Sequence, residues 1–292
     1  MKKGLILINA YAQSASADRV IERYKEEFCK LGVTIDVVRN NNATYYIGGS
    51  GVATSLNTQY DFALFFDKDK HLSYLCEQSG IPMFNSAQSI EYCDDKMMTY
   101  IKLLCSDITM PITISSPLCY STGDGTKFLN KVTEILTYPI VVKENYGSFG
   151  MQVYLAKTRA ELENLYARLI NKPHLYQQFI ASSSGMDTRM IVIGGKYFSA
   201  MKRVSKSDFR SNIELGGVGE EFCPTQSFID TAERVAKKLG LDYCGIDILF
   251  GEHNEPIVCE VNSNAFFIEM ERIARVNVAG RYASYIVGKV YK

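Results

Sequence analysis

The segment from Cys244 to Asn264, CGIDILFGEHNEPIVCEVNSN, carries side chains that could hold a metal ion. It has the pattern of two strands joined by a short polar turn before Pro256, and side chains along a strand alternate between its two faces. Glu260 and Asn262 therefore share one face, and Asp247 joins them if the two strands pair as a hairpin. That face then presents two carboxylates and an amide oxygen among apolar neighbours.

Oxygen ligands of this kind favour magnesium, which binds few protein carboxylates and leaves its other positions to water and substrate phosphates. The trio contains no Cys or His, so its ligand set does not favour zinc. The alternative is structural: Asp247 caps a turn and Glu260 meets a surface lysine. Two acids and an asparagine on one face favour the metal site.

Length and composition set the broad class of the protein. A chain of 292 residues exceeds one ordinary domain, and 47% hydrophobic and 12% aromatic residues are ample for a core. The 32 basic and 32 acidic side chains cancel and form no basic run, so we expect no nucleic-acid partner. The opening MKKGLILINAYAQ starts like a signal peptide, but its apolar run stops at Asn9 and indicates a first strand. No segment approaches the length of a membrane span.

The cysteines indicate a compartment. Eight of them are scattered without a CxxC pair, at positions 29, 76, 93, 105, 119, 223, 244 and 259. Several fall in apolar segments, which is typical of buried free thiols. We therefore expect a reducing compartment, the cytoplasm.

Strands and helices alternate over the first 86 residues. Apolar runs predict strands at 5–8, 35–38, 62–66 and 81–84, and helical spacing predicts helices at 20–31 and 71–78. This order is typical of a parallel α/β lobe, in which ligands bind at the carboxyl ends of the strands. Asn9, Asn85 and Ser86 follow such strands and are candidates for substrate contact.

Two glycine-rich segments could approach a phosphate group. IGGSG at 47–51 lacks the GK[ST] ending of a phosphate-binding loop and does not run from a clear strand into a helix, so we interpret it as a plain loop. NYGSFGMQV at 145–153 lies between two predicted strands, and its glycines allow backbone amides to come close to an anion. Lys143 just before it adds a cation for the same phosphates.

Charged side chains gather around one more predicted hairpin. Its strands are expected at 188–193 and 197–204, with Asp187, Arg189 and Arg203 at the outer ends, where charged groups can face a cleft. The segment KSDFRSNIELGGVG that follows has few bulky apolar residues and indicates a loop. That loop is either a solvated connection or a binding loop.

The order of these signals resembles the ATP-grasp superfamily, and within it the RimK-like branch of carboxylate–amine ligases that add glutamate. The resemblance rests on colinear motifs: DDK at 94–96, PIVVKE at 139–144, GSFG at 147–150, QQFI at 177–180, GMDTR at 185–189, FRSN at 209–212, GG at 216–217, GIDI at 245–248 and EVN at 260–262. It implies an α/β (α+β) chain with an N-terminal parallel lobe at 1–86, a central ATP-grasp lobe at 87–180 and a C-terminal lobe at 181–292.

The resemblance also implies site residues. ATP lies between the two later lobes, and magnesium, with manganese as a substitute, sits on Asp247, Glu260 and Asn262. Arg203 and Arg210 are the implied catalytic residues, on the acyl phosphate and on the γ-phosphoryl group. The nucleotide contacts are Gln178, Phe179 and Ile180 for adenine, Asp187 for ribose, Lys96 and Lys143 for phosphates, Gly147, Ser148 and Gly150 in a lid, and Ser211 and Asn212 in the loop.

The chemistry so implied is activation of a carboxylate as an acyl phosphate, followed by attack of an amine. The amine would be glutamate or another amino acid, joined to a metabolite, a peptide or a protein tail, and two copies of such ligases often pair. The chain departs from the family pattern at Gln178, at Gln152 and at 263–267, where SNAFF replaces a small-Pro-Gly segment. A phosphotransferase and a non-catalytic nucleotide-binding protein are the alternatives, although the intact metal trio and arginines argue against the second.

Overall fold

The first lobe is a parallel sheet, as the sequence predicts. The computed structural model describes residues 2–11, 14–49, 51–56, 59–121 and 123–292. The sheet has the strand order β2-β1-β5-β6, and every pair is parallel. Its strands are β1 (Lys2–Ile8), β2 (Val33–Arg39), β5 (Phe62–Phe66) and β6 (Met83–Phe84).

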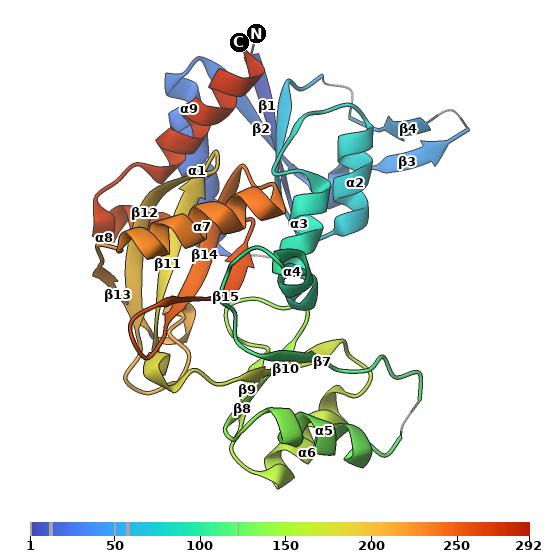
Figure 1. Ribbon diagram of the computed structural model, residues 1–292. Helices are drawn as coiled ribbons and strands as arrows, with labels where there is room; N and C mark the ends of the chain where they lie inside the picture. The colour runs from blue at the N-terminus through green and yellow to red at the C-terminus, as the bar shows by residue number, and fades with distance from the viewer. Residues whose placement is uncertain (1, 12–13, 50, 57–58, 122) are drawn as a thin grey trace.

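Helices cover this sheet because their apolar side chains recur on one face. Helix α1 buries Val20, Ile21, Tyr24 and Phe28. The other helices of this half are α2 (Lys70–Gln78), α3 (Ala87–Asp94) and α4 (Lys96–Leu103), with α1 at Ala15–Lys30 and the short η1 at Asn40–Asn42. The glycine segment at 47–51 connects an unforeseen hairpin, β3 (Tyr45–Gly48) and β4 (Gly51–Thr54), which projects from the lobe (Figure 1); Ser50 lies outside the described residues.

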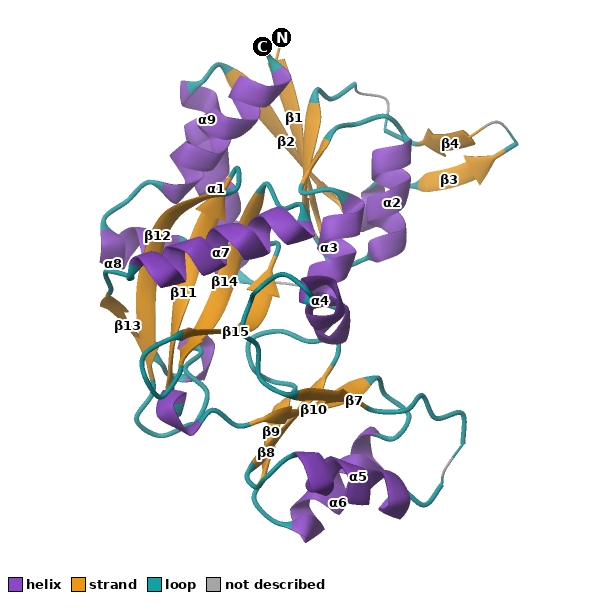
Figure 2. Ribbon diagram, viewed as in Figure 1, coloured by secondary structure: helices purple, strands orange, loops and turns teal. Residues whose placement is uncertain are grey.

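The central lobe is a small antiparallel sheet with two helices on one face (Figure 2). Its core comes entirely from its own residues, among them Leu129, Val142, Leu162 and Tyr176. The strand order is β7-β10-β8-β9, with β7 (Thr113–Ser115), β8 (Ile140–Glu144), β9 (Val153–Ala156), β10 (His174–Gln178), α5 (Thr126–Ile135) and α6 (Arg159–Leu169).

The last lobe is a five-stranded antiparallel sheet in the order β13-β12-β11-β14-β15. Its strands are β11 (Met186–Ile193), β12 (Lys196–Val204), β13 (Val218–Glu221), β14 (Tyr243–Phe250) and β15 (Pro256–Asn262). Around it lie α7 (Gln226–Leu239), α8 (Ile268–Ala274), α9 (Val278–Val290) and the turns η2 (Ala181–Ser183) and η3 (Ile213–Leu215). The predicted α/β class is confirmed, with one parallel and two antiparallel main sheets.

The first and last lobes share one apolar core. Tyr24 and Phe62 of the first lobe pack in the same cluster as Ile191, Phe267 and Tyr282 of the last. Helices α3 and α4 also lie against the last lobe, because Cys93 and Leu103 belong to the cluster of α7 and β14. The two lobes therefore form a joint base, from which the central lobe extends (Figure 1).

Asn85 is a structural bridge between these lobes and not the substrate contact expected from its place after a strand. It is 2% exposed. Its Nδ2 donates to the carbonyls of Tyr243 (2.8 Å) and Ser263 (3.0 Å). Its Oδ1 accepts from the N–H groups of Asp242 (2.7 Å) and Tyr243 (3.0 Å). Ser86 caps α3, because its Oγ accepts from the N–H of Ser89.

Candidate active site

The acidic hairpin has the pairing that the sequence predicts. Strands β14 and β15 are antiparallel, with Asp247 opposite Glu260 and Gly245 opposite Asn262. The register shifts after Asp247, so that Ile248 pairs with Val258 and Cys259 is the extra residue of a bulge. Residues directly opposite in such a pair share a face. Asp247, Glu260 and Asn262 therefore lie along one face of the sheet.

Asp247 is enclosed by two arginines. It is 3% exposed, and its two oxygens accept from Nε and Nη2 of Arg189, both at 2.8 Å. Nη2 of Arg203 lies 2.9 Å from Oδ2 of Asp247. On its other side Arg203 donates through Nε to Asp187 at 2.7 Å. The four side chains make a buried row of alternating charge, and the carboxylate expected to bind ribose, Asp187, faces Arg203.

This row keeps Asp247 ionised. Burial alone would raise the pKa of Asp247, but the charges and hydrogen bonds of Arg189 and Arg203 outweigh burial and lower the pKa to about 2. Asp247 does not cap a turn, as the structural alternative proposed.

Glu260 and Asn262 remain closer to open space. The Glu260 side chain is 26% exposed, and its Oε1 lies 3.5 Å from Nζ of Lys96. The structural alternative foresaw a lysine partner for Glu260, but Lys96 is buried and not on the surface. Nδ2 of Asn262 is buried without a hydrogen-bond partner. Among the described residues no three His, Cys, Asp or Glu side chains are grouped as metal ligands, so a cation here would need the Asn262 oxygen and phosphate oxygens.

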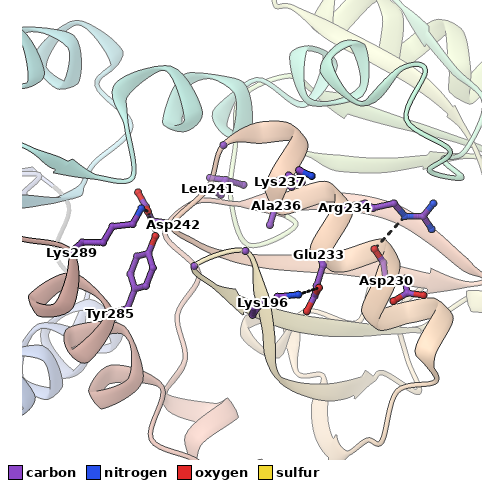
Figure 3. Close-up of a pocket in the computed structure, with 13 residues that line it drawn as sticks. Lys196, Asp230, Glu233, Arg234, Ala236, Lys237, Leu241, Asp242, Tyr285 and Lys289 are labelled. Atoms are coloured by element: carbon purple, nitrogen blue, oxygen red, sulfur yellow. Dashed lines mark hydrogen bonds and ion pairs between the residues drawn. The ribbon is translucent and has the colours of Figure 1, made fainter.

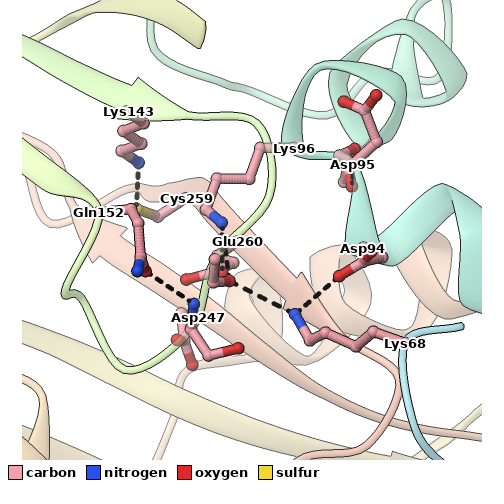
Figure 4. Close-up of polar contacts among 12 residues, drawn as sticks. Lys68, Asp94, Asp95, Lys96, Lys143, Gln152, Asp247, Cys259 and Glu260 are labelled. Carbon is pink, nitrogen blue, oxygen red and sulfur yellow. Dashed lines mark hydrogen bonds and ion pairs between the residues drawn. The ribbon is translucent and has the colours of Figure 1, made fainter. Parts of the chain in front are cut away.

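Two buried lysines approach the hairpin from other elements, as Figure 4 shows. Lys96 begins α4 and is 7% exposed, and burial lowers its pKa although Glu260 opposes the shift. Lys143 on β8 is 6% exposed, and its Nζ lies 3.5 Å from Sγ of Cys259. Burial raises the pKa of the Cys259 thiol, so Lys143 faces a neutral sulfur. Lys96 thus has a single carboxylate at 3.5 Å and Lys143 faces a thiol, an arrangement that suits a polyanion such as a nucleotide phosphate chain.

The glycine-rich turn lies directly over these groups. The carbonyl of Gly147 accepts from Nζ of Lys96 at 3.1 Å and from Nζ of Lys68 at 3.4 Å. The turn is closed internally by Gln152, whose Oε1 accepts from the N–H of Ser148 at 3.1 Å. Gln152, one departure from the family pattern, therefore fixes the shape of the turn.

Arg210 holds the other end of the same turn. Its Nη1 donates to the carbonyls of Gly150 (2.7 Å) and Val153 (3.2 Å), and Nη2 pairs with Asp208 at 2.7 Å. Those hydrogen bonds to Asp208 raise the pKa of Arg210. Asn212 also touches the turn, because a Cβ on Gly150 would lie 2.7 Å from its Oδ1. Ser211 is buried beside them.

The predicted adenine segment begins at the last residue of β10, Gln178. Gln178 is anchored to the start of β7 by its N–H, which donates to the carbonyl of Ile112 at 2.8 Å. Phe179 packs against Phe209, with ring centroids 6.4 Å apart. A cavity of about 90 Å³, the hinge cavity, is lined by Lys143, Phe179, Ile180, Asp187, Arg203 and Arg210. Most of the residues predicted for the nucleotide line this cavity, whereas Lys96, Gly147 and Ser148 do not, and Ser148 lines the second cavity described next.

A second cavity, the lobe-junction cavity, measures about 450 Å³ and is lined by Asn9, Asp67, Phe149, Arg189, Asn262 and Phe266. Glu260 lines both cavities. From the sequence, Arg189 is a charged residue at the end of a predicted hairpin without an assigned role, and Lys68 has no recognisable signal. The signal for Arg189 was its place two residues after Asp187 on one strand.

A hollow of about 910 Å³ lies elsewhere, between the β11–β12 turn, α7 and α9. Four of its charged side chains are paired: Lys196 with Glu233 and Lys289 with Asp242, both at 3.0 Å (Figure 3). No predicted site residue lines it, so it is not the candidate active site.

Comparison with known proteins agrees with this geometry. Residues 93–286 match the model of the RimK-like ATP-grasp domain. The chain is 34% identical over 213 residues to the N-acetylaspartylglutamate synthase A of Homo sapiens, covering 72% of this chain and 53% of the relative. It is 34% identical over 213 residues to a probable alpha-L-glutamate ligase of Thioalkalivibrio sulfidiphilus, covering 72% and 68%.

The fold has a solved counterpart. A RimK domain ATP-grasp protein of Sphaerobacter thermophilus superposes with a TM-score of 0.73 at 21% identity, covering 98% of this chain and 99% of that one. The chain belongs to the RimK-like ATP-grasp family. It spans about half the length of the human relative. None of the helices in the described ranges is both long and apolar enough to cross a membrane.

Proposed function

We propose that the protein is an ATP-dependent carboxylate–amine ligase that joins the two substrates through an acyl phosphate. The observation that carries the proposal is the convergence of Lys96 and Lys143 on the Asp247–Glu260 pair beneath a glycine-rich turn. Two buried ammonium groups, one with Glu260 at 3.5 Å and the other facing the thiol of Cys259, suit a phosphate chain.

The residues of the hairpin fit magnesium. Asp247, Glu260 and Asn262 offer the carboxylate and amide oxygens that hard cations prefer. Bound there, magnesium or its substitute manganese would neutralise phosphate charge and orient the γ-phosphoryl group. The unpartnered Nδ2 of Asn262 fits this use, because an amide whose oxygen binds a cation presents its nitrogen to a substrate oxygen.

ATP needs more space than the hinge cavity now offers. Its volume of about 90 Å³ is well below the roughly 300 Å³ at which ligand pockets begin. The glycine-rich turn must therefore lift from Lys96 and Arg210, so that phosphate oxygens replace the carbonyls of Gly147 and Gly150. Once closed again, the turn excludes water from the reaction.

The reaction itself needs no side-chain nucleophile. A substrate carboxylate oxygen attacks the γ-phosphorus and ADP leaves. A neutral amine then attacks the acyl carbon, phosphate leaves with the electron pair of the C–O bond, and the proton of the amine nitrogen passes to water. We assign Arg210 to stabilising charge on the phosphoryl group during transfer. We assign Arg203 to orienting the reacting oxygens, together with Arg189, to which it is linked through Asp247.

Glutamate is the amine that we propose first. The names of the two relatives, N-acetylaspartylglutamate synthase and alpha-L-glutamate ligase, both include it. The eight cysteines are free thiols in the structure, which supports a reducing compartment such as the cytoplasm.

The test is a matrix of carboxylates and amines, with ADP release as the readout and mass spectrometry of the product. A ligase gives ADP release that depends on both substrates and yields an amide. Phosphorylated substrate without any effect of amine would assign a phosphotransferase instead. No nucleotide turnover in any combination would contradict both.

A further inference from the structure

The carboxylate of Asp67 stands at the junction of three strands in the first lobe. Asp67 follows β5, Asn9 follows β1 and Asn40 follows β2, so all three lie at the carboxyl edge of the parallel sheet. Nδ2 of Asn9 donates to both oxygens of Asp67, at 3.1 and 3.2 Å. Nδ2 of Asn40 donates to Oδ2 at 2.8 Å, and the N–H of Lys68 to Oδ1 at 2.7 Å.

All of these donors are neutral, so they orient the carboxylate and leave its charge uncompensated. The nearest cations are directed elsewhere: Lys68 pairs with Asp94 at 2.8 Å, and Nη1 of Arg39 donates to the carbonyl of Asn9 at 3.4 Å. In the part of the chain that the structure describes, no lysine or arginine nitrogen lies within 4.0 Å of the Asp67 carboxylate.

Asp67 differs in this from the other acids around the lobe-junction cavity. Asp94 is paired with Lys68 and Glu260 with Lys96, while Asp18 and Glu214 are exposed. Asp67 is half-buried and oriented by three hydrogen-bond donors, and it has no cationic partner among the described residues. A negative group fixed in this way at a cavity wall is built to receive a positive charge from a ligand.

The cavity gives that ligand a direction. Ile8, Ile21 and Phe66 provide apolar wall beside Asp67, and Arg189 and Asn262 lie at the end that faces the acidic hairpin. Asn264, two residues beyond Asn262, approaches the carbonyl of Asp67 through its Nδ2 at 3.5 Å. Arg189 is already paired with Asp247, so the uncompensated half-buried charge of this cavity lies at Asp67, on its first-lobe side.

We infer that Asp67, oriented by Asn9 and Asn40, binds the ammonium group of the amine substrate, an amino acid. This inference rests on the proposed function and deepens it, because it places the reacting amine at the first-lobe wall of the cavity, from which it attacks as the neutral amine after losing a proton to water. A ligand without a free ammonium group, such as an N-acetylated amino acid, does not satisfy this subsite.

The test compares Asp67→Asn with Asp18→Asn, which removes an equal charge from the same cavity but touches neither Asn9 nor Asn40. The probe is the amino acid with the highest ADP release in the matrix. In Asp67→Asn its KM rises tenfold or more and the KM for ATP stays within twofold; in Asp18→Asn both stay within twofold. An unchanged amine KM in Asp67→Asn, or an equal rise in both variants, overturns the inference.

A second variant keeps the carboxylate. Asn9→Lys places an ammonium group of the protein beside Asp67, so it should compete with the substrate and also raise the amine KM. Circular dichroism and the KM for ATP show whether each variant is folded.

If the wild type shows no amine-dependent turnover, the proposed function fails and the subsite is tested by binding alone. A pool of the twenty amino acids should then raise the melting temperature of the wild type, and the pool of their N-acetyl forms should not. The effect should vanish in Asp67→Asn. The same shift with both pools, or none with either, overturns the ammonium subsite.

Discussion

Asp247 and Glu260 face each other across one strand pair, yet their carboxylates have different partners. Asp247 is buried between Arg189 and Arg203, whereas Glu260 is a quarter exposed and pairs with Lys96. Removing one partner of a buried ion pair leaves an uncompensated charge, which costs about 3–5 kcal/mol, while partly exposed pairs contribute about 0–1 kcal/mol. Substitutions of the two residues should therefore differ in their effect on stability, although both residues are proposed to hold the same cation.

We expect Asp247→Asn to lower the free energy of unfolding by about 3 kcal/mol or more and Glu260→Gln to lower it by less than about 1 kcal/mol. Both should reduce ADP release by about 100-fold or more, because each removes an oxygen ligand of the proposed cation. Urea unfolding and ADP release, measured side by side, check this. Wild-type turnover in both variants would remove the metal assignment.

The pKa of Asp247 adds a pH dependence. The folded-state pKa of about 2 lies below the ordinary value of 3.8, so the ionised carboxylate stabilises the fold above pH 3.8 and this contribution is lost as the pH falls towards 2. The stability difference between wild type and Asp247→Asn should shrink by about 2 kcal/mol between about pH 5 and about pH 2. Urea unfolding at several pH values measures it, and a constant difference would contradict the arginine pairing.

Sequence reasoning found the acids and lysines of the site but not all their partners. The alternation of a strand is enough to put Glu260 and Asn262 on one face. It does not reveal that Arg189 reaches Asp247, since that contact depends on β11 lying beside β14. The sequence likewise does not reveal the hydrogen bonds of Asp67 to Asn9 and Asn40, since they form only where the ends of three strands meet.

At the scale of elements, the glycine-rich turn is held by cations that are proposed to bind phosphate. Gly150 has φ +72°, and a Cβ there would lie 2.7 Å from Oδ1 of Asn212. Gly195 has nearly the same backbone, φ +76°, with nothing within 4 Å of a Cβ. Comparing alanine substitutions at Gly150 and Gly195 therefore distinguishes the effect of backbone strain from the effect of a contact with Asn212.

Gly150→Ala and Gly195→Ala should each destabilise the fold by about 1 kcal/mol, because both force alanine into the left-handed region. Only Gly150→Ala should raise the KM for ATP, by about tenfold, since its methyl group prevents the turn from closing on Asn212. Thermal unfolding and steady-state kinetics give the comparison. An equal effect of the two substitutions on the KM would assign the change to strain alone.

The elements themselves were largely predictable, because periodicity marks strands and helices directly. The β3–β4 hairpin was missed, since its glycine turn lacks a recognisable strand pattern on either side. The bulge at Cys259 could not be read from sequence, because a one-residue shift in pairing leaves no mark on composition. That shift is what turns Cys259 towards Lys143.

At the scale of the whole molecule, the three lobes expected from the sequence do not correspond to three separate apolar cores. The first and last lobes share one core and the Asn85 bridge, whereas the central lobe has a core of its own. The sequence could not show this, because the shared core joins residues as distant as Tyr24 and Tyr282.

We expect two units of local stability. Amides of β8 and β10 should exchange through an opening of lower free energy, and those of β1, β11 and β14 should exchange together at a higher one. Native-state hydrogen exchange in low urea, read by mass spectrometry, resolves the two groups. A single common free energy for all three sheets would contradict the division.

The position of one phenylalanine links the two cavities. Phe149 packs on Phe266, with ring centroids 5.9 Å apart, and walls the lobe-junction cavity, while its neighbour Gly150 walls the hinge cavity. Because Phe149 and Gly150 belong to one short turn, a movement of that turn opens the hinge cavity and the lobe-junction cavity together. On the proposed function, ADP and the amide should leave in one kinetic step, and a viscous cosolvent should slow the release of both by the same factor.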